Sequence, residues 1–284
     1  MSGNLDAKHL AVHVAYYLDQ ANVPNILFGW LAMSLAEIDR TCKQVDFVIR
    51  DDMIERATEV LHDLEIIPCA NYHCSERNVD RCATVPGRWR GFDRRIIGRY
   101  QPVAAEHFHL ENGEYVISLH ARSSLLWWLP EHLMPAGHPR DDPDNLGPLF
   151  QHSNNPRAWS PYGTRSWWEI HYPVRLLTRD AFTEAIIFLM CRDMDNPNLL
   201  DETWNRMLWW LAITEQMELR EYETGERNLI GTFQAFWESY VAANYYNPPV
   251  ELDEAVRHEA GRRSARQLRL LSEVMRSHGL LGLP

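Results

Sequence analysis

Residues 44–61, QVDFVIRDDMIERATEVL, decide the fold prediction because one periodicity gives way to another inside them. The first six residues form a short apolar stretch bounded by charge, which is typical of a buried strand. The residues after it repeat apolar side chains at the three-and-four spacing of a helix that lies on a sheet. These apolar residues are Ile54, Ala57, Val60, Leu61 and Leu64. The stretch therefore predicts a strand that leads into a helix starting near Asp52.

The sequence before this stretch predicts the same alternation. Residues 6–20 place apolar side chains at helical spacing. Residues 25–36, NILFGWLAMSLA, indicate a strand, a glycine turn and the start of a second helix. The predicted order is therefore helix, strand, helix, strand, helix, which is typical of an α/β region.

A hairpin is predicted in residues 105–121, AEHFHLENGEYVISLHA. The dipeptide Asn112-Gly113 suits a two-residue type I′ turn, which requires positive φ at both central positions. That turn would pair Glu111 with Glu114, His109 with Val116 and His107 with Ser118. Side-chain alternation then places three histidines on one sheet face. They are His107, His109 and His120.

Three imidazoles on one face could hold a transition metal, but histidines in a hairpin also serve as packed or surface residues. The sequence offers no fourth ligand at an informative spacing. The expectation is therefore that the chain binds no metal.

The rest of the chain divides into two parts. Seven prolines occur from residue 130 to residue 161, too many for regular structure, so a long loop or connection is expected there. From Thr178 onward four helical segments are predicted. The predicted fold class is α/β (α+β), with a sheet region in residues 1–129, a proline-rich connection in residues 130–177 and a packed helical region in residues 178–284.

Composition favours an ordinary globular protein. Apolar residues make up 45% of the 284 residues and charged residues 24%. No apolar run approaches the ~20 residues that cross a bilayer, and the N-terminus lacks the features of a signal peptide. The five cysteines show no CxxC spacing, which argues against a disulfide framework or a zinc ribbon. We expect a cytoplasmic protein with reduced thiols and no membrane partner.

The net charge of -11 argues against binding to nucleic acid, but the arginines are clustered. The stretch GRWRGFDRRIIGRY, residues 87–100, interleaves cations with aromatic rings. Guanidinium groups could pair with phosphates while the rings stack on unpaired bases of a tRNA acceptor end. A solvated loop that pairs with the chain's many acids is the alternative. The candidate tRNA-binding residues are Arg88, Trp89, Arg90, Arg94, Arg95 and Arg99.

Residues 28–49, FGWLAMSLAEIDRTCKQVDFVI, resemble the opening motif of the nucleotidyltransferase superfamily. In that motif a glycine turn leads into a helix, and the next strand carries two carboxylates for two magnesium ions. Gly29 and Asp46 fit, but Gln44 takes the place of the first carboxylate and Trp30 that of a small residue. A neutral amide is a poor magnesium ligand. The resemblance implies a nucleotidyltransferase-like N-terminal fold without metal-dependent nucleotidyl transfer.

Three acids come after the strand, and two interpretations apply to them. Asp52 with Glu55 three residues later fits a helix capping box, but Asp51 is not needed for a cap. The pattern Asp51-Asp52-x-x-Glu55 also resembles the DDxxE motif of the fungal arginine-containing cyclodipeptide synthases. VIRDDMIERA and LHARSSLLWWLP also resemble fungal proteins of this kind. The stretches that carry the resemblance all lie in the N-terminal half of the chain.

The resemblance implies an aminoacyltransferase of fungal secondary metabolism. Such a tRNA-dependent cyclodipeptide synthase joins arginine to a second amino acid as a diketopiperazine, cyclo(Arg-Xaa). Its substrates would be arginyl-tRNA and a second aminoacyl-tRNA, with no cofactor, no metal and no DNA partner. The implied catalytic residues are Asp51, Asp52 and Glu55, and the expected substrate-binding residues are Asp46, Trp30, His107 and His109.

The acids could grip a guanidinium, or one of them could accept a proton from the attacking amine. Bacterial cyclodipeptide synthases use a serine nucleophile, and no serine here aligns with it; Ser118, Ser123 and Ser124 are candidates by position. Two other functions compete with the synthase: a divergent nucleotidyltransferase, and a non-catalytic binding protein with the same fold.

Overall fold

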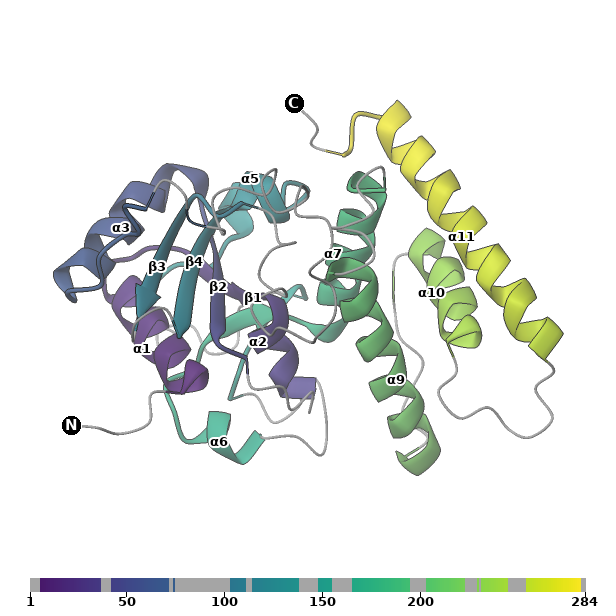
Figure 1. The fold of residues 1–284 in the computed structure, drawn as a ribbon, viewed down its shortest axis with the longest axis horizontal. Helices are drawn as coiled ribbons and strands as arrows, with labels where there is room; N and C mark the ends of the chain where they lie inside the picture. The colour runs from purple at the N-terminus through teal and green to yellow at the C-terminus, as the bar shows by residue number, and fades with distance from the viewer. Residues whose placement is uncertain are drawn as a thin grey trace. The chain divides into compact units, whose positions relative to one another are not determined.

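The structure, a computed structural model, describes eleven stretches of the chain. They are residues 6–36, 42–71, 74, 103–110, 114–137, 148–154, 165–194, 203–222, 229, 231–244 and 254–281. The chain divides into two compact units, Met1–Thr178 and Arg179–Pro284 (Figure 1). The fold is mixed α/β, as the sequence predicts.

The first unit is built on a mixed sheet of six strands within the described residues. The strands are β1 (Asn25–Phe28), β2 (Gln44–Ile49), β3 (Glu106–Leu110), β4 (Tyr115–Ala121), β5 (Phe150–His152) and β6 (Arg175–Leu177). Their spatial order is β3-β4-β2-β1-β6-β5. The β2/β4 and β1/β6 pairs are parallel and the other pairs are antiparallel. The central strands β1 and β2 are almost wholly buried, so they form the core of the unit.

Short helical elements connect and cover these strands. They are α1 (Ala7–Gln20), α2 (Gly29–Met33), α3 (Ile54–Asp63), α5 (Arg122–Leu125) and α6 (Arg165–Glu169), with 3₁₀ turns η1 (Ser34–Ala36), η2 (Asp51–Met53) and η5 (Glu131–Leu133). The carboxylate of Asp6 accepts a hydrogen bond from the Lys8 amide and so caps the start of α1. α1 packs against α3 and against both central strands. The predicted order of helix, strand, helix, strand, helix is confirmed.

The hairpin has the predicted register. His109 lies opposite Val116 and His107 lies opposite Ser118 in the antiparallel β3/β4 pair. The turn predicted at Asn112-Gly113, together with Glu111, lies outside the described residues. β4 also pairs with β2 in parallel, so the chain leaves both strands in the same direction.

The proline-rich stretch contains more regular structure than predicted. β5 forms within it, in a proline-free run between Pro148 and Pro156. Among the described residues, β5 is at the edge of the sheet and pairs with β6 alone, so its backbone is hydrogen-bonded along one side. Residues 130–177, predicted to be a connection, therefore contribute β5, α6 and β6 to the first unit.

The second unit contains the four predicted helical segments. They are α7 (Arg179–Arg192), α9 (Asn205–Tyr222), α10 (Gly231–Ala243) and α11 (Glu254–Ser277). α11 buries Ser264, Leu268, Ser272 and Met275 at three-and-four spacing. The Ser272 hydroxyl donates a 2.8 Å hydrogen bond to the Cys191 carbonyl and so links α11 to α7. Within the part of the chain that the structure describes, every helix is too short or too polar to span a lipid bilayer.

Candidate active site at the ends of strands β2 and β4

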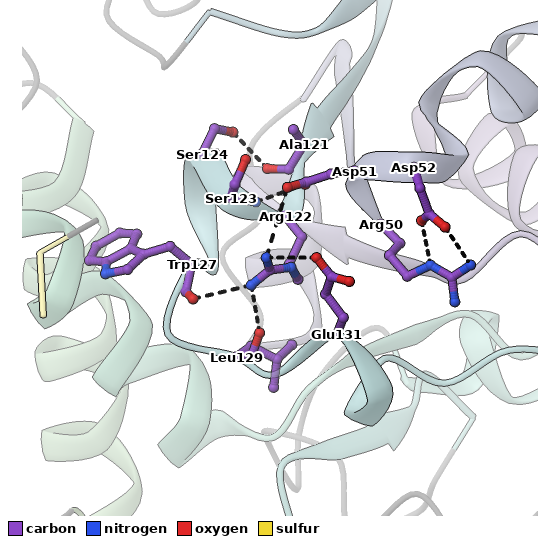
Figure 2. A network of polar contacts seen from close by, with 10 residues as sticks. All are labelled: Arg50, Asp51, Asp52, Ala121, Arg122, Ser123, Ser124, Trp127, Leu129 and Glu131. Carbon is purple, nitrogen blue, oxygen red and sulfur yellow. Dashed lines mark hydrogen bonds and ion pairs between the residues drawn. The ribbon is translucent and has the colours of Figure 1, made fainter. Parts of the chain in front are cut away.

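The predicted catalytic acids lie where two parallel strands end. The β2/β4 register runs to Ile49 opposite Ala121, so the chain leaves both strands at the same edge of the sheet. Residues 50–52 and residues 122–124 lie side by side just beyond that edge (Figure 2). The carboxyl ends of parallel strands are the usual position of ligand sites in α/β sheets.

Asp51 is held from the β4 side of this edge. Its Oδ1 accepts a 2.9 Å hydrogen bond from the Ser123 backbone amide, and its Oδ2 lies 3.8 Å from Arg122 Nη2. The Asp51 side chain is 35% exposed, so the carboxylate is oriented by the protein while remaining open to a ligand. Both contacts come from the start of α5, about seventy residues further along the chain.

Arg122 is itself fixed by neighbouring backbone. Its Nη1 donates to the carbonyls of Trp127 and Leu129 at 3.1 and 2.8 Å. Its Nη2 lies 3.2 Å from Glu131 Oε1, and Figure 2 shows the guanidinium between Asp51, Glu131 and the two carbonyls. Only 12% of the Arg122 side chain is exposed. Arg122 is therefore a rigid positive neighbour of Asp51.

Asp52 has a different partner. Arg50 Nε and Nη2 contact Asp52 Oδ1 and Oδ2 at 2.5 and 3.0 Å, which is the bidentate arrangement of a guanidinium and a carboxylate. The hydrogen bonds from Arg50 lower the pKa of Asp52 below its ordinary value. Asp52 is therefore negatively charged at neutral pH, and 63% of its side chain is exposed to solvent.

The capping-box interpretation of these acids is wrong. α3 begins at Ile54, its N-cap is Met53, and no side chain makes the capping hydrogen bond. A 3₁₀ turn intervenes between β2 and α3, and the Asp52 carboxylate is engaged by Arg50 instead. Glu55 is exposed in the first turn of α3, where a negative charge complements the helix dipole. Asp51 and Asp52, although adjacent, thus serve different partners.

Two predicted substrate-binding residues are buried rather than open at the sheet edge: Asp46 in β2 and Trp30 in α2. Asp46 is 2% exposed, and its Oδ1 lies 3.4 Å from His120 Nε2. A Cβ atom on Gly29 would lie 2.6 Å from Asp46 Oδ2, and Gly29 has φ of +71°, so only glycine fits there. Trp30 is the next residue and is 6% exposed. The glycine and the acid of the nucleotidyltransferase-like motif therefore face each other.

The other predicted residues fall elsewhere. His107 and His109 lie with Cys74, whose Sγ is 3.2 Å from the Nε2 of each, and His120 is turned to Asp46 instead. The predicted tRNA-binding residues, Arg88 to Arg99, lie outside the described residues.

Sequence reasoning missed Arg50 and Arg122 as partners of the acids. Pairing β2 with β4 in parallel would have indicated Arg122, because that register sets residue 51 beside residue 123. The sequence alone did not identify β2 and β4 as neighbours. Arg50 lies two residues from Asp52, so its local spacing was the signal for that pair.

Comparison of the chain with protein-family models, with curated proteins and with solved structures found no match. A functional assignment therefore rests on the residues of this site and on the motif resemblance that they carry.

Proposed function

We propose that this chain is a tRNA-dependent cyclodipeptide synthase that forms an arginine-containing diketopiperazine, cyclo(Arg-Xaa). One observation carries the proposal. The two stretches that resemble the fungal family, residues 48–57 and residues 119–130, meet at one sheet edge through the contacts of Asp51 with Ser123 and Arg122. Stretches that share a site are expected to be the ones that retain a family's pattern.

The proposed reaction needs neither ATP nor a metal, because each substrate is already an activated ester. The α-amine of one aminoacyl-tRNA attacks the ester carbonyl of the other, so an amide bond forms and the ester bond to the tRNA ribose breaks. The amine proton leaves, and the ribose oxygen gains a proton. The free amine of the dipeptidyl-tRNA then attacks its own ester carbonyl, which closes the ring and releases the second tRNA.

The two adjacent acids suit different roles in this reaction. Asp52 is exposed and its pKa is lowered, so it is negatively charged at neutral pH and suits contact with a cationic substrate group better than the role of proton acceptor. Asp51 is oriented by the Ser123 amide and keeps part of its carboxylate open, which suits contact with the attacking amine. Arg122 acts through Asp51 as a positioning residue.

The three serines that are candidates for a covalent route differ in exposure and in hydrogen bonding. Ser118 is 3% exposed within β4. The Ser124 hydroxyl donates a 2.7 Å hydrogen bond to the Ala121 carbonyl. Ser123 is exposed beside Asp51, so we assign it as the nucleophile to be tested if an aminoacyl-enzyme forms.

The nucleotidyltransferase alternative draws less support from the geometry. Asp46 is buried against His120, and Gln44 provides no second carboxylate, whereas a two-metal site needs several open oxygen ligands. Turnover of ATP or CTP with Mg²⁺ would favour that alternative. A non-catalytic binding protein would yield no product in either assay.

The deciding experiment is mass spectrometry of extracts from bacteria that express the full chain, compared with an empty-vector control. We expect a new arginine-containing diketopiperazine. Asp51→Asn should lower its yield at least ~100-fold, a usual minimum for a lost acid–base group, and leave the melting temperature nearly unchanged. Asp63→Asn, the same change at an exposed position at the end of α3, should leave the yield unchanged.

Two outcomes would contradict the proposal. One is a soluble, folded wild-type chain that makes no such compound from supplied arginyl-tRNA and mixed aminoacyl-tRNAs. The other is a yield in the Asp51→Asn variant equal to that of Asp63→Asn. Loss of product after RNase treatment of the purified reaction is expected of the synthase and not of a nucleotidyltransferase.

A further inference from the structure

A cluster of four metal-binding side chains lies away from the proposed active site, at the outer strand β3. His107 and His109 are two residues apart on β3 and therefore point to the same face of the sheet. Two cysteines from an earlier segment approach them. The four residues are Cys69, Cys74, His107 and His109.

Backbone contacts explain how the cysteines reach the strand. Pro68 forms an antiparallel bridge with Phe108, and the Cys69 amide donates a 2.9 Å hydrogen bond to the His107 carbonyl. The segment therefore runs alongside β3. The Cys74 amide donates a 3.1 Å hydrogen bond to the Asn71 carbonyl, and the Cys74 thiol lies beside the two imidazoles.

The distances fit one ion. Cys74 Sγ lies 3.2 Å from His107 Nε2 and 3.2 Å from His109 Nε2. One ligand atom from each of the four residues lies within 4.8 Å of all the others. In a tetrahedral zinc site, bonds of about 2.3 Å to sulfur and 2.0 Å to nitrogen set neighbouring sulfur and nitrogen atoms roughly 3.5 Å apart. A single ion at the centre of the cluster would therefore be within bonding distance after small adjustments.

The donor atoms select the class of metal. Two thiolates and two imidazoles suit zinc and other late transition metals, whereas magnesium and calcium prefer oxygen ligands. His107 is 1% exposed and Cys74 is 7% exposed, while Cys69 and His109 are half-buried. Four protein ligands complete a tetrahedron and leave no open position for substrate, which is typical of a structural rather than a catalytic zinc site.

We propose that Cys69, Cys74, His107 and His109 bind one zinc ion that fastens Cys69 and Cys74 to strand β3. The ion would also join the two ends of the arginine-rich segment, because Cys74 precedes it and β3 follows it in the sequence. Closing a long segment in this way reduces the conformational freedom of the unfolded chain. The site does not depend on the proposed synthase activity.

The sequence pattern predicted no metal site because only the histidines share a recognisable spacing. The first cysteine is separated from the first histidine by 37 intervening residues, and the two cysteines are separated by four. The spacing of the two cysteines falls within the range of zinc motifs, but the long gap before the first histidine and the single residue between the histidines do not. His120, which the sequence placed with the other two histidines, lies 3.4 Å from Asp46 and is not a member of the cluster.

The test is elemental analysis of the full chain, purified without added metal and without a chelating column or buffer. We expect about one zinc per wild-type chain. Cys69→Ser and Cys74→Ser should each lose it, with a fall in zinc affinity of at least ~100-fold, since loss of even an outer-shell partner costs 10–100-fold. Cys42→Ser, a change at another partly buried cysteine in the same unit, should retain the metal.

Cobalt provides a second measurement on the wild-type chain. Replacement of zinc by Co²⁺ should produce the strong visible absorption of tetrahedral cobalt and the charge-transfer bands of cobalt–thiolate bonds. This signal is measured on the wild-type chain, so it tests for a tetrahedral metal site with thiolate ligands even if a cysteine substitution prevents folding. His109→Gln, at a half-buried ligand, should weaken the thiolate bands less than Cys69→Ser does.

Three results would overturn the proposal. The first is a folded wild-type chain that carries no transition metal and takes up neither zinc nor cobalt. The second is full zinc content in both the Cys69→Ser and the Cys74→Ser variants, which would mean that the metal binds at another site. The third is a Cys69–Cys74 disulfide in the intact mass of protein purified under reducing conditions.

Discussion

At the residue scale, the two adjacent aspartates Asp51 and Asp52 have different partners and different exposure. Asp51 lies against α5 and its carboxylate accepts the Ser123 amide, whereas Asp52 turns to the Arg50 guanidinium. The difference arises because Asp51 is the first residue of a 3₁₀ turn beside the end of β4, and Asp52 is one step further round that turn. A DDxxE pattern read as a line of equivalent acids would miss this division.

The titration of Asp52 tests whether this carboxylate is paired with Arg50. Because Arg50 lowers the pKa of Asp52, the ion pair is present at neutral pH and is lost as the pH falls through the lowered value. Carboxyl-carbon NMR should show Asp52 titrating below the ordinary range. Arg50→Gln should raise the Asp52 pKa back toward the ordinary range of an exposed aspartate, because the hydrogen bonds that lower it are lost.

Arg56→Gln is the matched control for this titration. Arg56 lies on the same segment but pairs with Glu59, at 2.9 Å, so its loss should leave Asp52 titrating as in the wild-type chain. A wild-type Asp52 that titrates at the ordinary value would mean that the Arg50 contact does not persist in solution.

At the element scale, local pattern predicted the elements, and long-range contact decided the site. β2 matches the predicted residues 44–49, and the β3/β4 register was predicted from side-chain alternation and from the turn sequence Asn112-Gly113, both of which are local signals in the sequence. The approach of Cys69 to His107, and of Ser123 to Asp51, depends on pairings between segments that are distant in sequence. No local periodicity contains that information.

β5 is a strand that its own sequence does not predict. Its three residues, Phe150 to His152, show too little periodicity to indicate a strand among so many prolines. The strand exists because β6 offers hydrogen-bond partners along one edge. Prediction of β5 would therefore have required the position of β6 and the order of the strands in the sheet.

Helix α11 allows a test of how one element is stabilised. Leu268 is 8% exposed on its buried stripe, whereas Leu270, two residues further on, is 54% exposed. Leu268→Ala should lower the free energy of unfolding by about 2–3 kcal/mol, because it removes buried methyl groups and leaves a cavity. Leu270→Ala should lower it by less than about 0.5 kcal/mol. Urea unfolding of the full chain measures both.

The same substitution at both positions cancels differences in helix propensity. Equal losses of stability would therefore indicate that the buried stripe does not hold α11 in the second unit. A larger loss at Leu270 would mean that another surface covers the exposed face of the helix.

At the scale of the whole molecule, each unit has its own core and its own polar links. In the first unit the buried Asp19 carboxylate pairs with Arg175 and accepts hydrogen bonds of 2.7 Å from Tyr172 and from Asn25. These contacts join α1, β1 and β6 across more than 150 residues of sequence. Burial raises the pKa of Asp19 even though Arg175 opposes the shift. The second unit is linked instead by contacts such as that of Ser272 with Cys191.

The proposed zinc ion belongs to the first unit alone, and this gives a prediction about the whole chain. Metal removal with a chelator should speed amide hydrogen exchange at β3 and at Cys69, whose amide donates to the His107 carbonyl, because the ion no longer holds the two segments together. Exchange in α7, α10 and α11 should change little, since α11 packs on α7 and on α10 within the second unit. Exchange followed by mass spectrometry of peptides, with and without chelator, measures both.

Cys42→Ser should respond to the chelator as the wild-type chain does, and Cys69→Ser should resemble the chelated protein before any chelator is added. Equal acceleration in both units would show that zinc holds the whole chain rather than one strand, and no acceleration at β3 would remove the structural role from the proposed site.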